Sequence, residues 1–179
     1  MNGRALALLL FAAAAAQADQ AWVFEPGQAL VSVELGPAKA RLSATSLGMS
    51  GRVSELTDGS VHAEIRVALA SFATSASTAG QQLKSEAAQF PEIVFEGAAP
   101  SAGQNGTMHL EGTLTFHGVS HPLALPVTVV RAAGLTFGHA TLSLHLRDYG
   151  FALPPGVPDE VRVEVDAGLR HEGALVSRG

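Results

Sequence analysis

The sequence predicts an all-β domain that contains one short helical segment. Apolar and polar residues alternate strictly in several separate runs, which is the periodicity of strands with one buried face. Pairs of turn-forming residues separate the runs, and one stretch departs from the alternation. Strands of this kind must hide one continuous apolar surface, so the expected architecture is a sandwich or a closed barrel.

The amino-terminal half contains the first of these strands. One strand is predicted at 29–35, where every second residue is apolar. The span 39–57 is interpreted as two weaker strands with a break near Leu47 and Gly48. Alternation is clearest in 61–69, whose apolar positions are Val61, Ala63, Ile65, Val67 and Leu69.

A single short helix is predicted between Ser77 and Gln89. The stretch begins with Ser and Thr, which favour helix starts, and continues with good helix formers. Pro91 follows and stops the helix. The helix therefore interrupts an otherwise all-β chain.

The carboxyl-terminal half contains four further alternating runs, within 110–117, 123–129, 140–147 and 161–170. We therefore expect seven to nine strands in the whole chain. Turn pairs and prolines separate the runs, at Asp58-Gly59, Asn105-Gly106, Ala133-Gly134, Pro154, Pro155 and Pro158.

Strand length favours a barrel over a sandwich. The runs are longer than the average strand, and most connections are short, as in an up-and-down barrel. An eight-stranded barrel is either filled by its own side chains or just wide enough for one ligand. The inward residues are mostly Val, Leu and Ala, and aromatic residues make up 6% of the chain, which leaves room inside. Alternation alone does not decide between a filled core and a hollow one.

Residues 1–18 have the layout of a secretory signal peptide. A positive start at Arg4 precedes an unbroken apolar run that ends at Ala16, and Ala18 completes the small-residue pattern of a cleavage site. The run is too short to span a bilayer. We therefore expect residues 19–179 to form a single mature domain in the bacterial periplasm.

The composition argues against several classes of partner and site. A formal net charge of −5 makes the chain a poor partner for nucleic acid or anionic lipid headgroups. The chain has no cysteine, which excludes disulfides, thiolate sites and a lipoprotein-type cysteine anchor. In an oxidising compartment, the fold must therefore be stabilised by burial alone.

Three stretches of the sequence resemble a known family. "FPEIVFEG" (90–97) resembles its Phe-Pro pair followed by a strand, and "GTLTFHGVSHPLALPV" (112–127) resembles its most specific hairpin. "LRDYGF" (146–151) with "VPDEVRVEVDAGL" (157–169) resembles, more loosely, its Arg-x-Asp-Phe-Gly element and last strand. Over the whole expected mature domain, the chain resembles the YceI-like proteins, which are exported, lipocalin-like and polyisoprenoid-binding.

The resemblance implies an eight-stranded antiparallel lipocalin-like barrel with a helical lid region. The apolar tunnel of such a barrel takes an isoprenoid chain, for example a polyprenyl quinone or a polyprenyl phosphate. The resemblance implies neither a metal, a cofactor nor a catalytic residue set. We accordingly expect periplasmic binding and carriage of an isoprenoid lipid, with transient contact with a membrane.

The expected ligand-binding residues are apolar and lie on the inward faces of the predicted strands or in the helical region. The alternation places them inside without distinguishing a tunnel lining from a dry core, and the resemblance favours the tunnel. They are Val31, Val33, Ile65, Val67, Phe72, Leu83, Phe90, Phe95, Leu114, Phe116, Leu125, Val127, Leu142, Leu144, Val163 and Val165.

His117 and His121 invite a metal interpretation because they are four residues apart. That spacing aligns two imidazoles on a helix, but Gly118 and Pro122 place this pair at a turn. His117 also falls on the polar positions of its run, so we expect it to face outward. We interpret the corner as a structural element that fixes the hairpin register, with Gly118 present for backbone geometry.

The sequence contains neither a nucleophile elbow nor a glycine-rich phosphate loop. We therefore expect a binding protein and not an enzyme. An alternative is a periplasmic stress or interaction protein whose barrel is filled and whose rim binds a partner. A cavity of several hundred Å³ distinguishes the ligand carrier from this alternative.

Overall fold

Strands dominate the part of the chain described by the computed structural model, which comprises residues 18–35, 42–74, 77–101, 106–132, 134–151, 153 and 158–172. The strands are β1 Ala18–Leu35, β2 Leu42–Ser46, β3 Met49–Leu56, β4 Val61–Ala68, β5 Ala73–Thr74, β6 Glu92–Ala99, β7 Gly106–Phe116, β8 Val119–Ala132, β9 Leu135–His145 and β10 Glu160–His171. The helices are α1 Ser77–Ala87 and two 3-10 helices, η1 Leu69–Ser71 and η2 Leu146–Tyr149.

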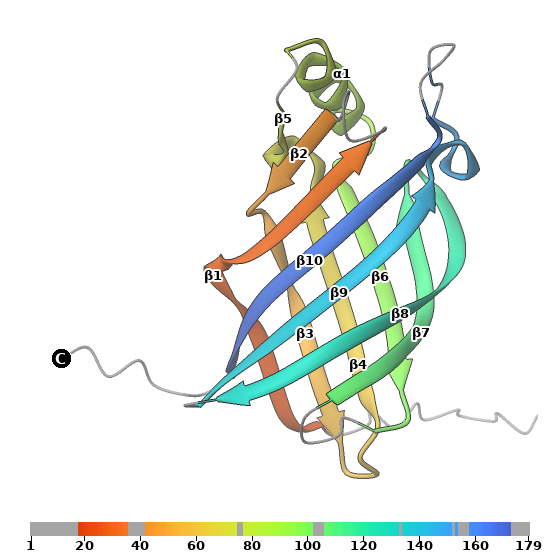
Figure 1. Ribbon diagram of the computed structural model, residues 1–179. Coiled ribbons are helices and arrows are strands. Elements are labelled where there is room, and N and C mark those ends of the chain that lie inside the picture. Colours follow the sequence, from red (N-terminus) through yellow and green to blue (C-terminus); the bar gives the residue numbers. More distant parts are fainter. Residues whose placement is uncertain are drawn as a thin grey trace, which may run out of the picture.

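Eight of the strands form a closed antiparallel barrel (Figure 1). Each strand pairs with its neighbour in the order β1-β3-β4-β6-β7-β8-β9-β10, and β10 pairs back onto β1. Closure gives every strand of the barrel two partners, which removes the exposed edges of an open sheet. The predicted all-β barrel with one short helix is therefore confirmed.

The first strand begins earlier than the alternation predicts, because a bulge interrupts the alternating pattern within it. β1 starts at Ala18, whereas the alternating run starts only at Ala29. Between Phe24 and Ala29 the register with β10 shifts, and Gly27 there has a φ of +76°. Before the bulge β1 pairs with β3, and after it with β2. One chain segment therefore takes part in both the barrel wall and the rim.

The inward faces of the strands meet in pairs of apolar residues. Val31 lies opposite Val165, and Phe95 lies opposite Leu114. Two clusters of buried residues result, one centred on β4, β6, β7 and β8, the other on β1 and β10. The alternation thus places its apolar side chains inside the barrel, as expected.

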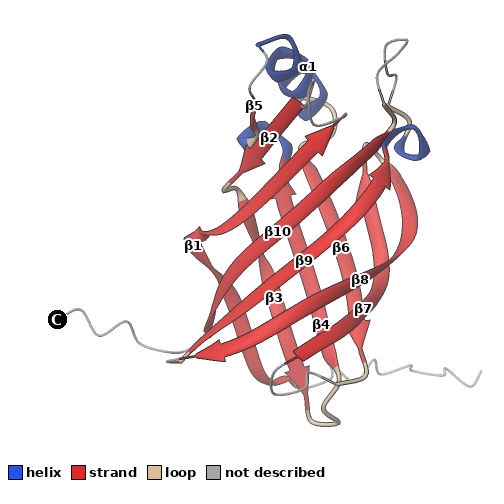
Figure 2. Ribbon diagram, in the orientation of Figure 1, coloured by secondary structure: helices blue, strands red, loops and turns tan. Residues whose placement is uncertain are grey.

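The helix lies at the upper end of the barrel (Figure 2), beside the short strands β2 and β5. It packs against η1 and β5. The chain after Ala87 tightens into a turn, in which the Phe90 amide donates to the Glu86 carbonyl at 2.8 Å. The predicted helix is confirmed, although it ends two residues before Gln89.

Two predicted turns adopt the geometry that their residues favour. Gly59 has a φ of +83°, and the Asp58 carboxylate accepts the Ser60 amide at 2.9 Å. His117 and Gly118 join β7 to β8 with φ values of +52° and +74°. Two positive φ values match the right-handed twist of a tight hairpin, and Gly118 supplies one without strain. Asn105 and Ala133 lie outside the described residues.

The expected signal peptide lies outside the described residues, except for Ala18, which begins β1. Within the described ranges, no helix has the length and apolar character needed to cross a membrane.

Candidate ligand cavity

The upper half of the barrel encloses a cavity of about 290 Å³, here called the upper cavity. It lies beneath α1 and between the strand ends that surround the helix. Its walls are almost wholly apolar, and the polar residues among its described lining are Ser43, Thr74 and Gln82, all uncharged. The cavity therefore suits an uncharged, largely hydrocarbon ligand.

Most of the expected ligand-binding residues line this cavity. They come from β1, β4, β6, β7, β8, β9 and β10, from α1 and from Phe72 beside η1. The ones found there are Val31, Val33, Ile65, Val67, Phe72, Leu83, Phe95, Leu114, Phe116, Leu125, Leu142, Leu144, Val163 and Val165. Their contact with a ligand remains a prediction.

The other two expected residues lie elsewhere. Val127 lines a second cavity of about 90 Å³ at the opposite end of the barrel, here called the lower cavity. Phe90 lines neither cavity, because it follows the end of α1 and packs on the β7–β8 turn. Its ring centroid lies 4.1 Å from that of His117, and its edge faces Gly118. Phe90 therefore helps to attach the helix to the barrel.

The upper cavity also has lining residues that the expectation omitted. Leu123 and Val161 share the inward parity of Leu125 and Val163, so the alternation contained the signal for both. Leu146, Phe151 and Leu153 lie on or after η2, where no strand periodicity could reveal their direction. The same holds for Met49, which opens β3 directly after the break at Leu47 and Gly48. Leu69 lines the cavity as well, and it shares the inward parity of Ile65 and Val67 in the run 61–69.

His117 packs at the rim against the helix and η2 and is partly buried, so the predicted outward orientation is wrong. The residue belongs to the turn rather than to β7, and its φ of +52° takes the side chain out of the strand parity. The ring is 19% exposed. Nε2 lies 2.8 Å from a carboxylate oxygen of Glu86 on α1, and Nδ1 lies 3.1 Å from the Tyr149 carbonyl oxygen of η2. His117 thus joins three elements at the rim.

His121 supports the same structural interpretation. Its Nε2 donates to the Asp148 carbonyl at 2.9 Å, next to the carbonyl that His117 contacts. The two histidines therefore bond to separate main-chain oxygens of η2 instead of converging on a common point. Tyr149 is buried beneath them, with its ring 5.1 Å from that of His121. Burial, followed by the nearby Asp148 charge, raises the pKa of the Tyr149 phenol.

A hydrogen-bonded corner holds the opposite side of the rim. Ser46 ends β2 and is buried, with its hydroxyl 2.6 Å from that of Ser71 in η1. The Ser46 hydroxyl also accepts the Gly48 amide at 3.0 Å. A Cβ at Gly48 would lie 2.3 Å from the Ser71 hydroxyl oxygen, so glycine is needed for this close approach. These bonds fix β2, and with it part of the cavity mouth, against η1.

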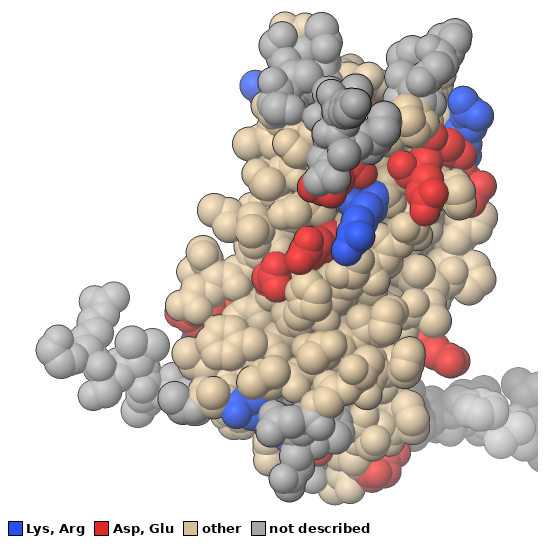
Figure 3. Space-filling model, in the orientation of Figure 1, with Lys and Arg blue, Asp and Glu red and all other residues tan. Residues whose placement is uncertain are grey.

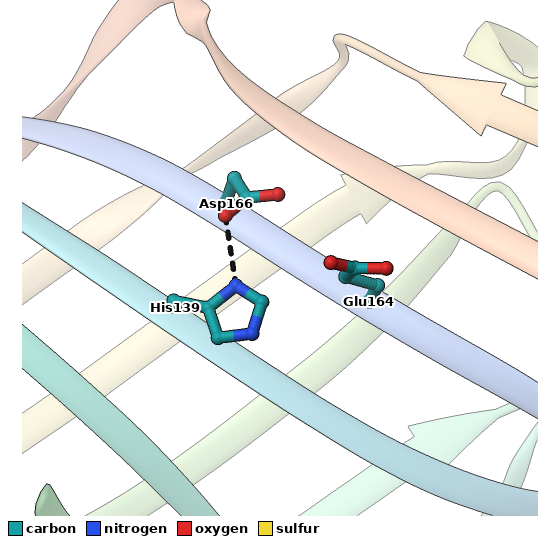
Figure 4. A group of neighbouring side chains, drawn as sticks. All are labelled: His139, Glu164 and Asp166. Carbon is teal, nitrogen blue, oxygen red and sulfur yellow. Dashed lines mark hydrogen bonds and ion pairs between the residues drawn. The ribbon is translucent and has the colours of Figure 1, made fainter.

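One group of potential metal ligands lies on the outer wall of the barrel (Figure 4). His139, on β9, lies opposite Asp166 on β10, and its Nδ1 is 2.8 Å from a carboxylate oxygen of that residue. Glu164 lies one position along the same outward face, and all three side chains are exposed. Sequence analysis missed the group because only strand register brings these residues together. The arrangement forms an exposed hydrogen bond between His139 and Asp166, and an exposed contact of this kind is weakly stabilising at most.

On the face drawn in Figure 3, the described residues form no continuous basic surface of the kind that binds nucleic acid. Figure 3 shows acidic groups gathered over the upper part of one face, with few basic groups among them. Arg66 on β4 has its pKa raised by hydrogen bonds from its guanidinium to Glu64 and Glu92. This cation therefore already has two carboxylate partners.

Comparison with known proteins places this barrel among related folds. The model of the YceI-like domain family matches residues 22–169. None of the curated proteins gives a significant match. The crystal structure of BcnA from Burkholderia cenocepacia is 18% identical, with a TM-score of 0.70 over 81% of this chain and 98% of that one.

Two further solved structures share the architecture. A polyisoprenoid binding domain from Saccharophagus degradans, implicated in plant cell wall breakdown, has a TM-score of 0.67 at 13% identity, over 84% of this chain and 98% of that one. A YceI protein from Campylobacter jejuni has a TM-score of 0.58 at 15% identity, over 72% and 84%. These likenesses show the fold, and the family match covers most of the chain. The protein therefore belongs to the YceI-like domain family.

Proposed function

We propose that this protein binds an isoprenoid lipid in its upper cavity and carries it through the periplasm. The observation that carries the proposal is the apolar cavity of about 290 Å³ beneath α1. An isoprenoid tail has no hydrogen-bonding groups, so it enters an apolar bore without leaving a polar group unpaired. The polyisoprenoid binding domain from Saccharophagus degradans shares the fold, which supports the same ligand class.

The lining of the cavity favours a ligand with an uncharged head. Ser43, Thr74 and Gln82 come from β2, β5 and α1, which surround the mouth. Hydroxyl and amide groups can donate hydrogen bonds to carbonyl oxygens, such as those of a quinone. No charged residue lines the upper cavity among the residues that the structure describes. A polyprenyl quinone therefore fits better than a polyprenyl phosphate.

The energetics favour reversible carriage, in which the lipid returns readily to a membrane, over irreversible capture. Burying a CH₂ group from water contributes roughly 0.8 kcal/mol, so a tail taken from water would bind very tightly. The lipid instead starts in a bilayer, where its tail is already in hydrocarbon. The net gain on transfer is then close to zero, and the protein exchanges lipid with a membrane through transient contact.

The amino-terminal sequence supports a periplasmic location for this exchange. Residues 1–18 combine a positive start, an apolar run and small residues at a cleavage site. The absence of cysteine is compatible with an oxidising compartment. Fractionation of the native host tests this part of the proposal. We expect the full-length protein in the periplasmic fraction, and its loss from that fraction when residues 1–18 are removed.

The alternative is a stress or interaction protein with a filled barrel. The upper cavity counts against it, since about 290 Å³ lies close to the lower end of the range for ligand pockets, roughly 300–1,000 Å³. A filled barrel of this fold would leave voids hardly larger than a water molecule.

Lipid extraction tests the proposal directly. The protein is purified from its native host without detergent, and its bound lipids are identified by mass spectrometry. Leu144 lines the upper cavity and Ser143 beside it faces outward, so Leu144→Trp and Ser143→Trp form a matched pair. We expect isoprenoid in the wild type and in Ser143→Trp, and its loss in Leu144→Trp. Repeated absence of isoprenoid from folded wild-type protein would contradict the proposal.

A further inference from the structure

The two cavities in the barrel are adjacent, and four of the residues that the structure describes lie between them. Met49, Ile65, Leu125 and Val165 line both the upper and the lower cavity. Met49 and Ile65 come from the β3–β4 wall, while Leu125 and Val165 come from β8 and β10. In the strand order these pairs stand on different sides of the barrel. The four side chains therefore form a neck across the bore.

The neck is apolar and contains one adaptable member. Met49 is 9% exposed, and its unbranched side chain rotates more freely than the branched Ile65, Leu125 and Val165. A hydrocarbon chain that reaches the neck meets no polar side chain there. Met49 is therefore the neck residue whose side chain moves aside most readily for a hydrocarbon chain.

The lower cavity continues the bore toward the end opposite α1. Its described lining is mostly apolar and includes Val53, Val127 and Val129. Trp22 and Arg131 also line it, with the guanidinium carbon 5.6 Å from the centroid of the indole ring. The Trp22 ring meets His171 edge-on, with 5.8 Å between centroids. These contacts hold the indole in place at the far end of the bore.

We infer that the lower cavity receives the far end of the bound tail, and that the neck and Trp22 set the tail length that the protein prefers. This inference rests on the proposed function and names its ligand class more closely. The upper cavity alone, at about 290 Å³, is small for a long polyprenyl chain. A short tail ends above the neck, whereas a long tail passes Met49 and reaches Trp22.

The single tryptophan of the chain makes the tail position measurable. Trp22 lines the lower cavity, so its fluorescence reports on a quencher that arrives there. Wild-type protein is loaded from vesicles with a short prenol, farnesol, or a long one, solanesol. Each prenol is used unmodified and in a form brominated at the end of its tail, on the carbon farthest from the hydroxyl. We expect brominated solanesol to remove most of the Trp22 emission, and brominated farnesol to change it little.

A matched pair of variants separates the lower cavity from the rest of the barrel. Gly138 faces the lower cavity, and the nearest atom to a Cβ built there is a Val127 methyl carbon at 3.6 Å, so Gly138→Leu fills the cavity with little strain. Ser143, on the outer face of the same strand, gives the control Ser143→Leu. We expect Gly138→Leu to abolish quenching by brominated solanesol while farnesol binding persists, and Ser143→Leu to behave as the wild type.

The outcomes distinguish this inference from the function on which it rests. Should both prenols bind by mass spectrometry while neither brominated form quenches wild-type Trp22, the lower cavity is only a packing void and the length selection is wrong. Equal quenching by the short and long brominated prenols would also overturn the length selection. If neither prenol binds, the proposed function fails as well.

Discussion

At the scale of single residues, His117 shows how the rim of the cavity is assembled. Its two ring nitrogens face the Glu86 carboxylate and the Tyr149 carbonyl, and both of these groups only accept hydrogen bonds. The ring is also held between Phe90 and Phe151, at centroid distances of 4.1 and 4.9 Å. One turn residue therefore connects α1, the β7–β8 hairpin and η2.

Replacing His117 tests this structural role. His117→Ala removes two partly buried hydrogen bonds and two ring contacts, so we expect a loss of about 2–3 kcal/mol in the free energy of unfolding. Urea denaturation followed by circular dichroism measures it. His109→Ala, at an exposed position on β7, is the control, with an expected change within about 0.5 kcal/mol. Equal effects of the two substitutions would show that the His117 contacts contribute nothing.

Tyr149 gives a prediction about alkaline pH. It is the single tyrosine of the chain, and burial and Asp148 raise its pKa above the ordinary value of about 10. The unfolded chain therefore loses this proton at lower pH than the folded one. The contribution of Tyr149 to stability is complete below about pH 10 and is lost as the pH rises through the folded pKa.

Ultraviolet absorbance of the tyrosinate measures this shift in one residue. We expect the Tyr149 phenol to ionise at higher pH in the native protein than in the protein unfolded by denaturant. Tyr149→Phe should remove the absorbance change and serves as the control. Coincident native and denatured transitions would contradict the assigned burial.

At the scale of elements, α1 acts as a cover that is attached at only a few points. Leu83 is half-buried, lines the upper cavity and packs against the larger core cluster. Glu86 contacts His117 one turn later along the helix. A short helix is only marginally stable without tertiary contacts. These two residues therefore decide how tightly α1 closes the mouth of the cavity.

Loosening the helix should leave the barrel intact. Leu83→Ala removes a half-buried side chain. We expect the free energy required to open α1 to fall by about 1–2 kcal/mol. Amide hydrogen exchange of the helix should accelerate about tenfold, while exchange in the barrel strands stays unchanged. Lys84→Ala, at an exposed helix position, is the control. Faster exchange throughout the barrel would show that α1 is part of the core and not a cover.

The elements also show what sequence reasoning can and cannot reach. Alternation located most strands, because each buries one face against the interior. It missed the first half of β1, since Glu25, Pro26 and Gly27 interrupt the pattern at the bulge. It also misplaced the direction of His117, because a residue with positive φ in a turn does not follow strand parity. Bulges and turns therefore limit the prediction more than the strands do.

At the scale of the whole molecule, closure of the sheet stabilises a chain that has no disulfide. β1 pairs with β10 from Leu35 opposite Val161 to Trp22 opposite His171. The closed sheet keeps a bore that is lined by the inward residues and divided at the neck into two cavities. The sequence could predict which residues face inward, but not that a cavity of about 290 Å³ remains among them. Free volume depends on strand number and register, which alternation does not specify.

A bound tail should stabilise the whole barrel. A ligand present at about a hundred times its dissociation constant adds roughly 2.7 kcal/mol to the folded state. For a domain of this size, that corresponds to an increase in Tm of about 5–10 °C. Calorimetry of lipid-extracted protein and of protein reloaded with solanesol measures the difference. Leu144→Trp, whose cavity is filled, should show no such increase, and an equal increase in this variant would place the ligand outside the bore.

Electron density inside the barrel is the most direct test of the central claim. A crystal structure of the protein purified from its native envelope, without detergent or added lipid, would be determined. We expect continuous, elongated density that starts at the mouth near Gln82, passes along Phe95 and Leu142, and continues through the neck at Met49. A bore closed by the protein's own side chains, or one holding only separate water peaks, would contradict the account.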